Sequence, residues 1–179
     1  MIALWDAYWP ALTAAIVIGV LAGAVAFRAL PDRRSKSREF RMHAAKVIAA
    51  GGALVLAIGG VWHGPLGTAE RFAVSLENQS RQVLVNYEMT QVQANIERAP
   101  IRRTIVLAGP ADDFQRNSLV EIIDLVPGVG QVRWVGTSEP FALPLLAEAE
   151  LGALLFFGLG LLLAYLLELR RRYRAQWSW

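Results

Sequence analysis

The chain has 179 residues and contains no cysteine, which excludes disulfide bridges, thiolate metal sites and cysteine nucleophiles. Its residues are 55% hydrophobic, and its mean hydropathy of +0.37 is higher than that of a soluble domain with an ordinary polar surface. We therefore expect lipid to cover part of the protein.

The basic residues are clustered, although a pI near 9.7 would by itself suit a nucleic-acid partner. Eleven of the 18 Lys and Arg residues lie in residues 28–46 and 170–174. Residues 64–150 contain seven basic and eleven acidic residues, so this part of the chain is mildly acidic. Nucleic acid is therefore not an expected partner.

Three uncharged blocks predict three membrane-spanning helices. The first block, Ala7–Phe27, has 21 residues and would be about 31 Å long as a helix, against a hydrocarbon core of about 30 Å. Trp5 and Trp9 stand at its start, where amphipathic rings favour the headgroup level. We assign residues 1–28 to this helix and expect an anchor, because no Lys or Arg precedes the block as in a cleaved signal.

The other two blocks are shorter. Val47–Trp62 has only 16 uncharged residues and needs the residues before it to match the membrane, and Leu151–Leu167 has 17. The expected boundaries are a second helix at 46–63, a third at 145–169, and basic cytoplasmic segments at 29–45 and 170–179.

The distribution of Lys and Arg predicts the orientation, because basic loops are retained on the cytoplasmic side. Three crossings place both basic segments on the same side of the membrane. We therefore expect a bacterial inner-membrane protein with a periplasmic N-terminus, a cytoplasmic C-terminus and a periplasmic domain at residues 66–138.

The first half of this domain shows a helix pattern followed by two strand patterns. The spacing of the apolar residues predicts an amphipathic helix over residues 69–87. Strict alternation over 91–97 predicts a strand, and the β-branched run Thr104–Ala108 predicts a second one. Residues 98–103 would form the hairpin between them. The apolar side of the helix is expected to carry Phe72, Leu76, Val83, Leu84 and Tyr87.

The second half predicts one more helix and one more strand. Asp112 and Gln115 have the spacing of a capping box at a helix start. The apolar positions that follow repeat at helical spacing up to Val126, and residues 129–135 predict the third strand. The fold class is thus a membrane protein with three transmembrane α-helices and a small α+β domain of order αββαβ.

This order resembles the BON domain. The resemblance covers residues 69–135 and is carried by the strand end Leu107-Ala108-Gly109 and by the junction Val126-Pro127-Gly128-Val129. Gly109, Pro127, Gly128 and Val129 are the residues that match the motif. BON domains are non-enzymatic modules of bacterial envelopes that associate with phospholipid surfaces or neighbouring proteins, and the resemblance implies the same for this domain.

The sequence offers little for catalysis, and we expect neither a catalytic nor a metal site. The two histidines are His43, in the basic loop, and His63, at the outer end of the second crossing. Asp112 and Asp113 could pair at a metal, but acids at a helix start favour capping. His63 could ligate haem or chlorophyll from a helix bundle, although a hydrogen bond at the interface is the simpler role. No cofactor is expected, with bound lipid or pigment left open.

Small residues recur at every fourth position in each apolar block, which gives each helix a smooth face that permits close packing. Such faces could pack the three helices on each other or also dock them onto a larger assembly. The residues concerned are Ala15, Gly19 and Gly23, then Ala49, Ala53 and Ala57, then Gly160 and Ala164.

These features favour a non-catalytic accessory subunit of a bacterial inner-membrane complex, for example a respiratory or photosynthetic one. Its expected partners are membrane lipids and other integral membrane subunits. The alternative is an independent envelope module whose domain binds phospholipid or a periplasmic protein. A third hypothesis is a pigment or haem carrier that uses His63.

Overall fold

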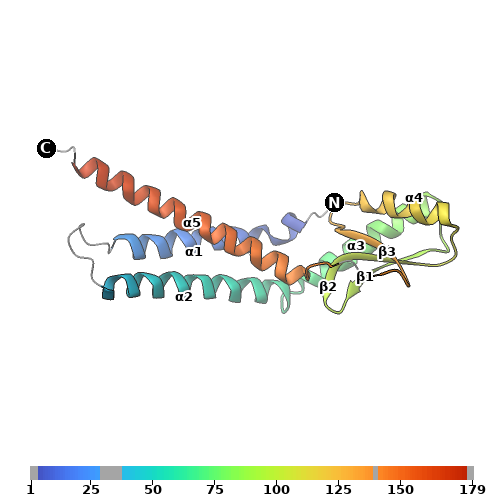
Figure 1. The fold of residues 1–179 in the computed structure, drawn as a ribbon, viewed down its shortest axis with the longest axis horizontal. Coiled ribbons are helices and arrows are strands. Elements are labelled where there is room, and N and C mark those ends of the chain that lie inside the picture. Colours follow the sequence, from blue (N-terminus) through green and yellow to red (C-terminus); the bar gives the residue numbers. More distant parts are fainter. Residues whose placement is uncertain (1–3, 29–37, 139–140, 177–179) are drawn as a thin grey trace. The chain divides into compact units, whose positions relative to one another are not determined.

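The structure, a computed structural model, describes residues 4–28, 38–138 and 141–176 (Figure 1). The chain divides into two compact units. The helical unit comprises residues 9–62 and 149–179, and the α/β unit comprises residues 1–8 and 63–148.

Three long helices carry the apolar blocks: α1 (Leu4–Arg28), α2 (Arg38–His63) and α5 (Leu145–Gln176). Each contains a stretch that is long and apolar enough to span a membrane. The protein therefore has three helices compatible with a three-pass membrane protein, as the uncharged blocks predict.

Two of these helices are longer than the sequence boundaries. α2 begins at Arg38, inside the segment expected as a loop at 29–45, and α5 continues to Gln176 through most of the expected tail. The first charge ends an uncharged block but not a helix, because Arg, Glu, Lys and Ala are good helix formers. The rest of the loop, 29–37, and tail residues 177–179 lie outside the described residues.

The helical unit has its own apolar core, in which the ring of Phe157 on α5 is central. A Cβ atom on Gly51 of α2 would lie 3.1 Å from both that ring and the methyl group of Ala22 on α1, so the three helices meet here. The buried residues of this core are Leu12, Ala15, Ala22, Val55, Ala153 and Phe157.

The α/β unit has the element order α3 (Thr68–Asn86), β1 (Gln93–Arg98), β2 (Ile101–Ala108), α4 (Asp113–Asp124) and β3 (Gln131–Trp134). This order agrees with the one expected from the sequence. The sheet order is β1-β2-β3, with β1 and β2 antiparallel and β2 and β3 parallel. Helix α4 provides the crossover that a parallel pair requires.

The hairpin between the first two strands is tighter than expected. Residues 98–103 were expected as its loop, but Arg98 pairs with Ile101 and only Ala99 and Pro100 remain between the strands. Arg102 and Arg103 precede the run Thr104–Ala108 that marks the strand in the sequence, and the strand of the structure includes them. Arg102 pairs with Glu97 and Arg103 with Glu148, so both basic residues are accommodated within the strand.

Helices α3 and α4 contact the sheet and each other, which places them on the same face. Of the stripe predicted on α3, Phe72, Leu76 and Leu84 are buried, whereas Tyr87 is exposed. Tyr87 caps the C-terminal end of the helix, just beyond its last turn. The fully buried large side chains of this core include Phe72, Leu76, Leu84, Ile105, Leu107 and Ile123.

Candidate functional site

The small residues predicted on α1 and α5 are brought together in the helical unit. A Cβ atom on Gly19 would lie 3.0 Å from the Cα of Gly160 and would overlap the backbone of α5. One turn further, a Cβ atom on Gly23 would lie 2.6 Å from the Cβ of Ala164. Ala15, at the other end of the stripe, is buried. Helix backbones approach this closely only where small residues permit it.

The small residues predicted on α2 lie elsewhere: Ala49, Ala53 and Ala57 are exposed. The buried stripe of α2 begins at Gly51, two residues after Ala49. Because an α-helix turns by about 200° over two residues, Ala49 and Gly51 lie on nearly opposite sides of α2. The predicted stripe is therefore on the opposite side of α2 from the other two helices. The buried side of α2 carries Gly51, Val55 and Gly59.

An ionic cluster that the sequence analysis missed lies near the Arg28 end of α1. The carboxylate of Glu168, only 8% exposed, accepts hydrogen bonds from Arg171 at 2.9 Å and from Arg172 at 2.8 Å. Arg172 also donates to the backbone oxygen of Phe27 at 3.2 Å. The spacing of three and four residues between acid and base could have predicted the first two bonds. The third joins α5 to the end of α1.

Two glutamates near the start of α5 have contrasting surroundings. In the α/β unit, Glu148 accepts a 2.7 Å bond from Arg103. In the helical unit, the carboxylate of Glu150 lies against Gly59 of α2, where an added Cβ would be 2.9 Å from its Cδ. Its buried Oε2 has no hydrogen-bond partner among the described residues. An ionisable group on a membrane-spanning helix is costly without a partner, so Glu150 is a candidate functional residue.

His63 has a hydrogen-bond partner within the α/β unit. The hydroxyl of Tyr8 lies 2.7 Å from its Nδ1, and the two rings stack with centroids 6.2 Å apart. This agrees with the simpler of the two roles considered for His63. Ligation of haem or chlorophyll by His63 stays a hypothesis.

The motif residues of the BON resemblance lie at the two ends of the connection between β2 and β3. Gly109 has a φ of +138°, and a Cβ there would lie 2.6 Å from the backbone oxygen of Gln91. Gly128 has a φ of +100° and lies over the ring of Phe72. Pro127 is exposed, and the backbone N–H of Val129 bonds to the oxygen of Val126, closing the turn after α4. The positions of Gly109 and Gly128 favour glycine because their φ angles are positive, but the family assignment stays a prediction.

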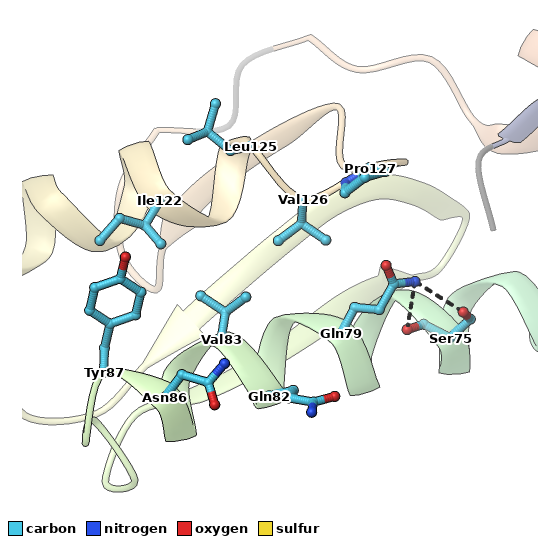
Figure 2. A pocket seen from close by; sticks show the side chains of 10 residues that line it. All are labelled: Ser75, Gln79, Gln82, Val83, Asn86, Tyr87, Ile122, Leu125, Val126 and Pro127. Carbon is cyan, nitrogen blue, oxygen red and sulfur yellow. Dashed lines mark hydrogen bonds between the residues drawn. The ribbon is translucent and has the colours of Figure 1, made fainter. Parts of the chain in front are cut away.

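A groove of about 680 Å³ lies between α3 and the C-terminal end of α4, and we call it the α3–α4 groove (Figure 2). Val126 and Pro127 belong to the junction named in the sequence, but that junction does not predict a groove, because the walls come from two helices whose relative placement only the fold determines. Its apolar lining comes from α4, from the turn after it and from one residue of α3. These residues are Val83, Ile122, Leu125, Val126 and Pro127.

The polar lining of this groove is entirely uncharged and comes from α3 and its end. Gln79 donates from Nε2 to the backbone oxygen of Ser75 at 3.3 Å and to its hydroxyl at 3.1 Å, as Figure 2 shows. The amides of Gln82 and Asn86 follow along the helix, and the ring of Tyr87 lies at one end. The groove therefore offers amide donors and acceptors beside an apolar wall.

Within residues 4–28, 38–138 and 141–176, no group of three or more His, Asp or Glu residues is placed so that it could hold a metal ion. The capping box is present: Asp112 accepts from the Gln115 backbone at 2.7 Å, and the Gln115 side chain accepts from the Asp112 backbone. Asp112 therefore caps the N-terminus of α4, and Asp113 lies in its first turn.

Comparison with known proteins gives no match: no protein-family model, no curated protein and no solved structure is similar to this chain. The candidate sites are therefore judged on their geometry alone.

Proposed function

We propose that this protein is a non-catalytic accessory subunit of a bacterial inner-membrane complex, of an energy-transducing kind such as a respiratory or photosynthetic assembly. Its α/β unit would be a BON-type domain on the periplasmic side. The observation that carries the proposal is the small-residue side of α2. Ala49, Ala53 and Ala57 are exposed there, although small residues on α1 and α5 are used for helix packing.

The same side of α2 continues to Gly60. A Cβ atom on Gly60 would meet nothing within 4 Å, so small residues recur on this side for about three turns from Ala49, with the exposed side chain of Leu56 between them. In lipid, helices associate through close van der Waals packing, and flat small-residue surfaces permit the closest approach. A helix of another subunit is the partner that would use this surface, since lipid chains need no flat surface to pack against.

Two charge features support the orientation. The Lys and Arg residues around residues 28–46 and 170–174 favour the cytoplasm for both segments. The mildly acidic composition of residues 64–150 is compatible with translocation. Cysteine accessibility tests this: a cysteine at exposed Asn117 should react with a membrane-impermeant maleimide in intact spheroplasts, and one at exposed Arg170 should not.

The main test is recovery of a complex from the native membrane. A tagged chain extracted in mild detergent should co-migrate with other integral membrane proteins on gel filtration, identifiable by mass spectrometry. The double variant Ala53→Leu/Ala57→Leu should lose them, because its α2 surface is no longer flat. Recovery of the unaltered protein alone and monodisperse would contradict the proposal.

The matched control for that variant is Leu54→Phe. Leu54 is exposed on α2 but lies about 100° around the helix from Ala53, and phenylalanine also adds volume there. This control should retain the co-migrating proteins. Loss of the complex in both variants would show that α2 is disturbed generally, and that the small-residue side has no special part.

The alternative, a phospholipid-binding envelope module, has one observation in its favour. Phe114 and Phe141 of the α/β unit are 81% and 86% exposed, and aromatic side chains insert readily into the headgroup layer. Nanodiscs that hold the full chain should then co-float with separate liposomes, and Phe114→Ser/Phe141→Ser should abolish co-flotation. Co-flotation without any recovered partner would favour this second function.

A further inference from the structure

The lining of the α3–α4 groove limits the kinds of ligand that the groove can bind. None of the ten residues that line it is Asp, Glu, Lys or Arg, although 18% of the chain is charged. A charged ligand would thus lose water without gaining a counter-charge from the lining. The expected ligand is uncharged along the part that enters the groove.

A lipid acyl chain is also a poor match. The wall formed by Val83, Ile122 and Val126 would accept hydrocarbon, but the amides of Gln82 and Asn86 border the same space. A hydrocarbon chain over these amides would remove their water and offer no hydrogen bond in return, which is unfavourable for each group left unpaired. The occupant should therefore carry donors and acceptors along one edge.

A polypeptide backbone supplies both, at a matching spacing. Gln82 and Asn86 are four residues apart on α3, so their side chains are about 6 Å apart. In an extended peptide, groups on the same edge repeat every two residues, or about 6.6 Å. Each primary amide can donate to a peptide carbonyl and accept from a peptide N–H. Two successive peptide units of one extended strand can thus pair with the two amides.

Side chains project from the faces of such a strand, perpendicular to its hydrogen-bonding edges, so the side chains of one face would lie against the apolar wall. The Nε2 of Gln79 is already bonded to Ser75, which leaves its carbonyl oxygen as one further acceptor at the same edge. Leu125 and Tyr87, which line the groove, are 82% and 56% exposed and would gain apolar contacts from a bound segment. The wall selects apolar side chains and the amides select the extended backbone.

We propose that the α3–α4 groove binds an extended, uncharged, apolar peptide segment of a partner protein, held by Gln82 and Asn86. The origin of this segment rests on the proposed function: the segment would belong to another subunit of the same complex. Binding of the peptide itself can be measured without that complex.

The test uses the full chain in nanodiscs and calorimetric titration with the capped peptide acetyl-Thr-Val-Thr-Leu-Thr-Val-Thr-amide. This neutral peptide should bind, whereas versions with Lys or Glu in place of Val and Leu should not. Gln82→Ala/Asn86→Ala should weaken binding about tenfold through the lost hydrogen bonds. The control Asn78→Ala/Asn117→Ala removes two exposed amides outside the groove and should bind as the unaltered protein does.

Failure of the neutral peptide to bind, equal binding of the charged peptides, or an unchanged affinity in the groove variant would each overturn the proposal. Displacement of the peptide by dihexanoylphosphatidylcholine would assign the groove to lipid and would also overturn it. Circular dichroism and thermal unfolding of each variant establish that it is folded. If the protein purifies alone yet binds the peptide, the proposed function fails while the groove assignment stands.

A photo-crosslinker identifies the segment in living cells. Benzoylphenylalanine in place of Leu125 should crosslink to an uncharged apolar stretch of another protein, and Gln82→Ala/Asn86→Ala should reduce the yield several-fold. The same group in place of Phe114, which is equally exposed at the other end of α4, should not reach that stretch. Crosslinks from Leu125 to a charged stretch, or equal crosslinks from both positions, would count against the proposal.

Discussion

Gly19 of α1 lies directly against Gly160 of α5, so that a Cβ atom added to either glycine would be about 3 Å or less from the Cα of the other. Neither residue has room for a side chain. This pair sets the distance between the first and last helices of the helical unit, and it leads to the first prediction.

Gly19→Leu should destabilise the helical unit by about 1 to 3 kcal/mol or more, because the side chain can enter only if the two helix backbones separate. Thermal unfolding in detergent, followed by circular dichroism, would show a lowered Tm. Gly158→Leu is the matched control on α5, since a Cβ there meets nothing within 4 Å. Equal loss of stability in both variants would contradict the close contact.

Arg172→Met should lower the stability of the helical unit by about 1 to 3 kcal/mol, because it removes one partner of the nearly buried Glu168 carboxylate and the bond to the Phe27 backbone. Thermal unfolding measures the loss. Arg170→Met is the control, since Arg170 is exposed and two residues away on the same helix. A Tm for Arg172→Met no lower than that of the control would show that the bond to α1 contributes nothing.

Glu148→Gln and Glu150→Gln should act in opposite directions. Glu148 pairs with Arg103, so neutralising it should cost about 1 kcal/mol of stability. Glu150 has a buried oxygen without a hydrogen-bond partner in the described part of the chain, so the amide should leave stability unchanged or raise it by about 1 kcal/mol. Denaturant or thermal unfolding compares the two. A larger loss for Glu150→Gln would show that its carboxylate has an unrecognised ligand.

Asp112→Ala should lower the stability of the α/β unit by about 1 kcal/mol, because α4 loses the side-chain acceptor for the Gln115 backbone N–H. Asp113→Ala, in the first turn of α4, removes a charge at the same helix end but no cap, and it should cost less. Thermal unfolding followed by circular dichroism would report both changes. Equal losses would mean that the charge matters and the cap does not.

Local signals in the sequence predicted the elements of this fold well. The uncharged blocks predicted three long apolar helices, and the alternation over 91–97 and the capping box of Asp112 predicted a strand and a helix start that the structure contains. Each of these signals acts between residues that are close in the chain. The helix ends at Arg38 and Gln176 were missed, because charge marks the end of an apolar block and not the end of a helix.

What the sequence could not predict depends on residues far apart in the chain. Ala49 and Gly51 both belong to plausible small-residue stripes of α2, and only the positions of α1 and α5 decide which stripe is buried. The bond from Arg172 to Phe27 and the α3–α4 groove have the same origin. Tertiary packing chooses among surfaces that local patterns describe equally well.

The contact between Gly19 and Gly160 also has a consequence for biogenesis. The ribosome makes α1 before α5, with the strands of the sheet and helices α2, α3 and α4 between them. The flat surface of α1 around Gly19 and Gly23 therefore has no α5 to pack against while these elements are being made. Close packing of α1 in the helical unit must wait for synthesis of α5, and a chain cut short before residue 145 would leave that surface without its partner helix.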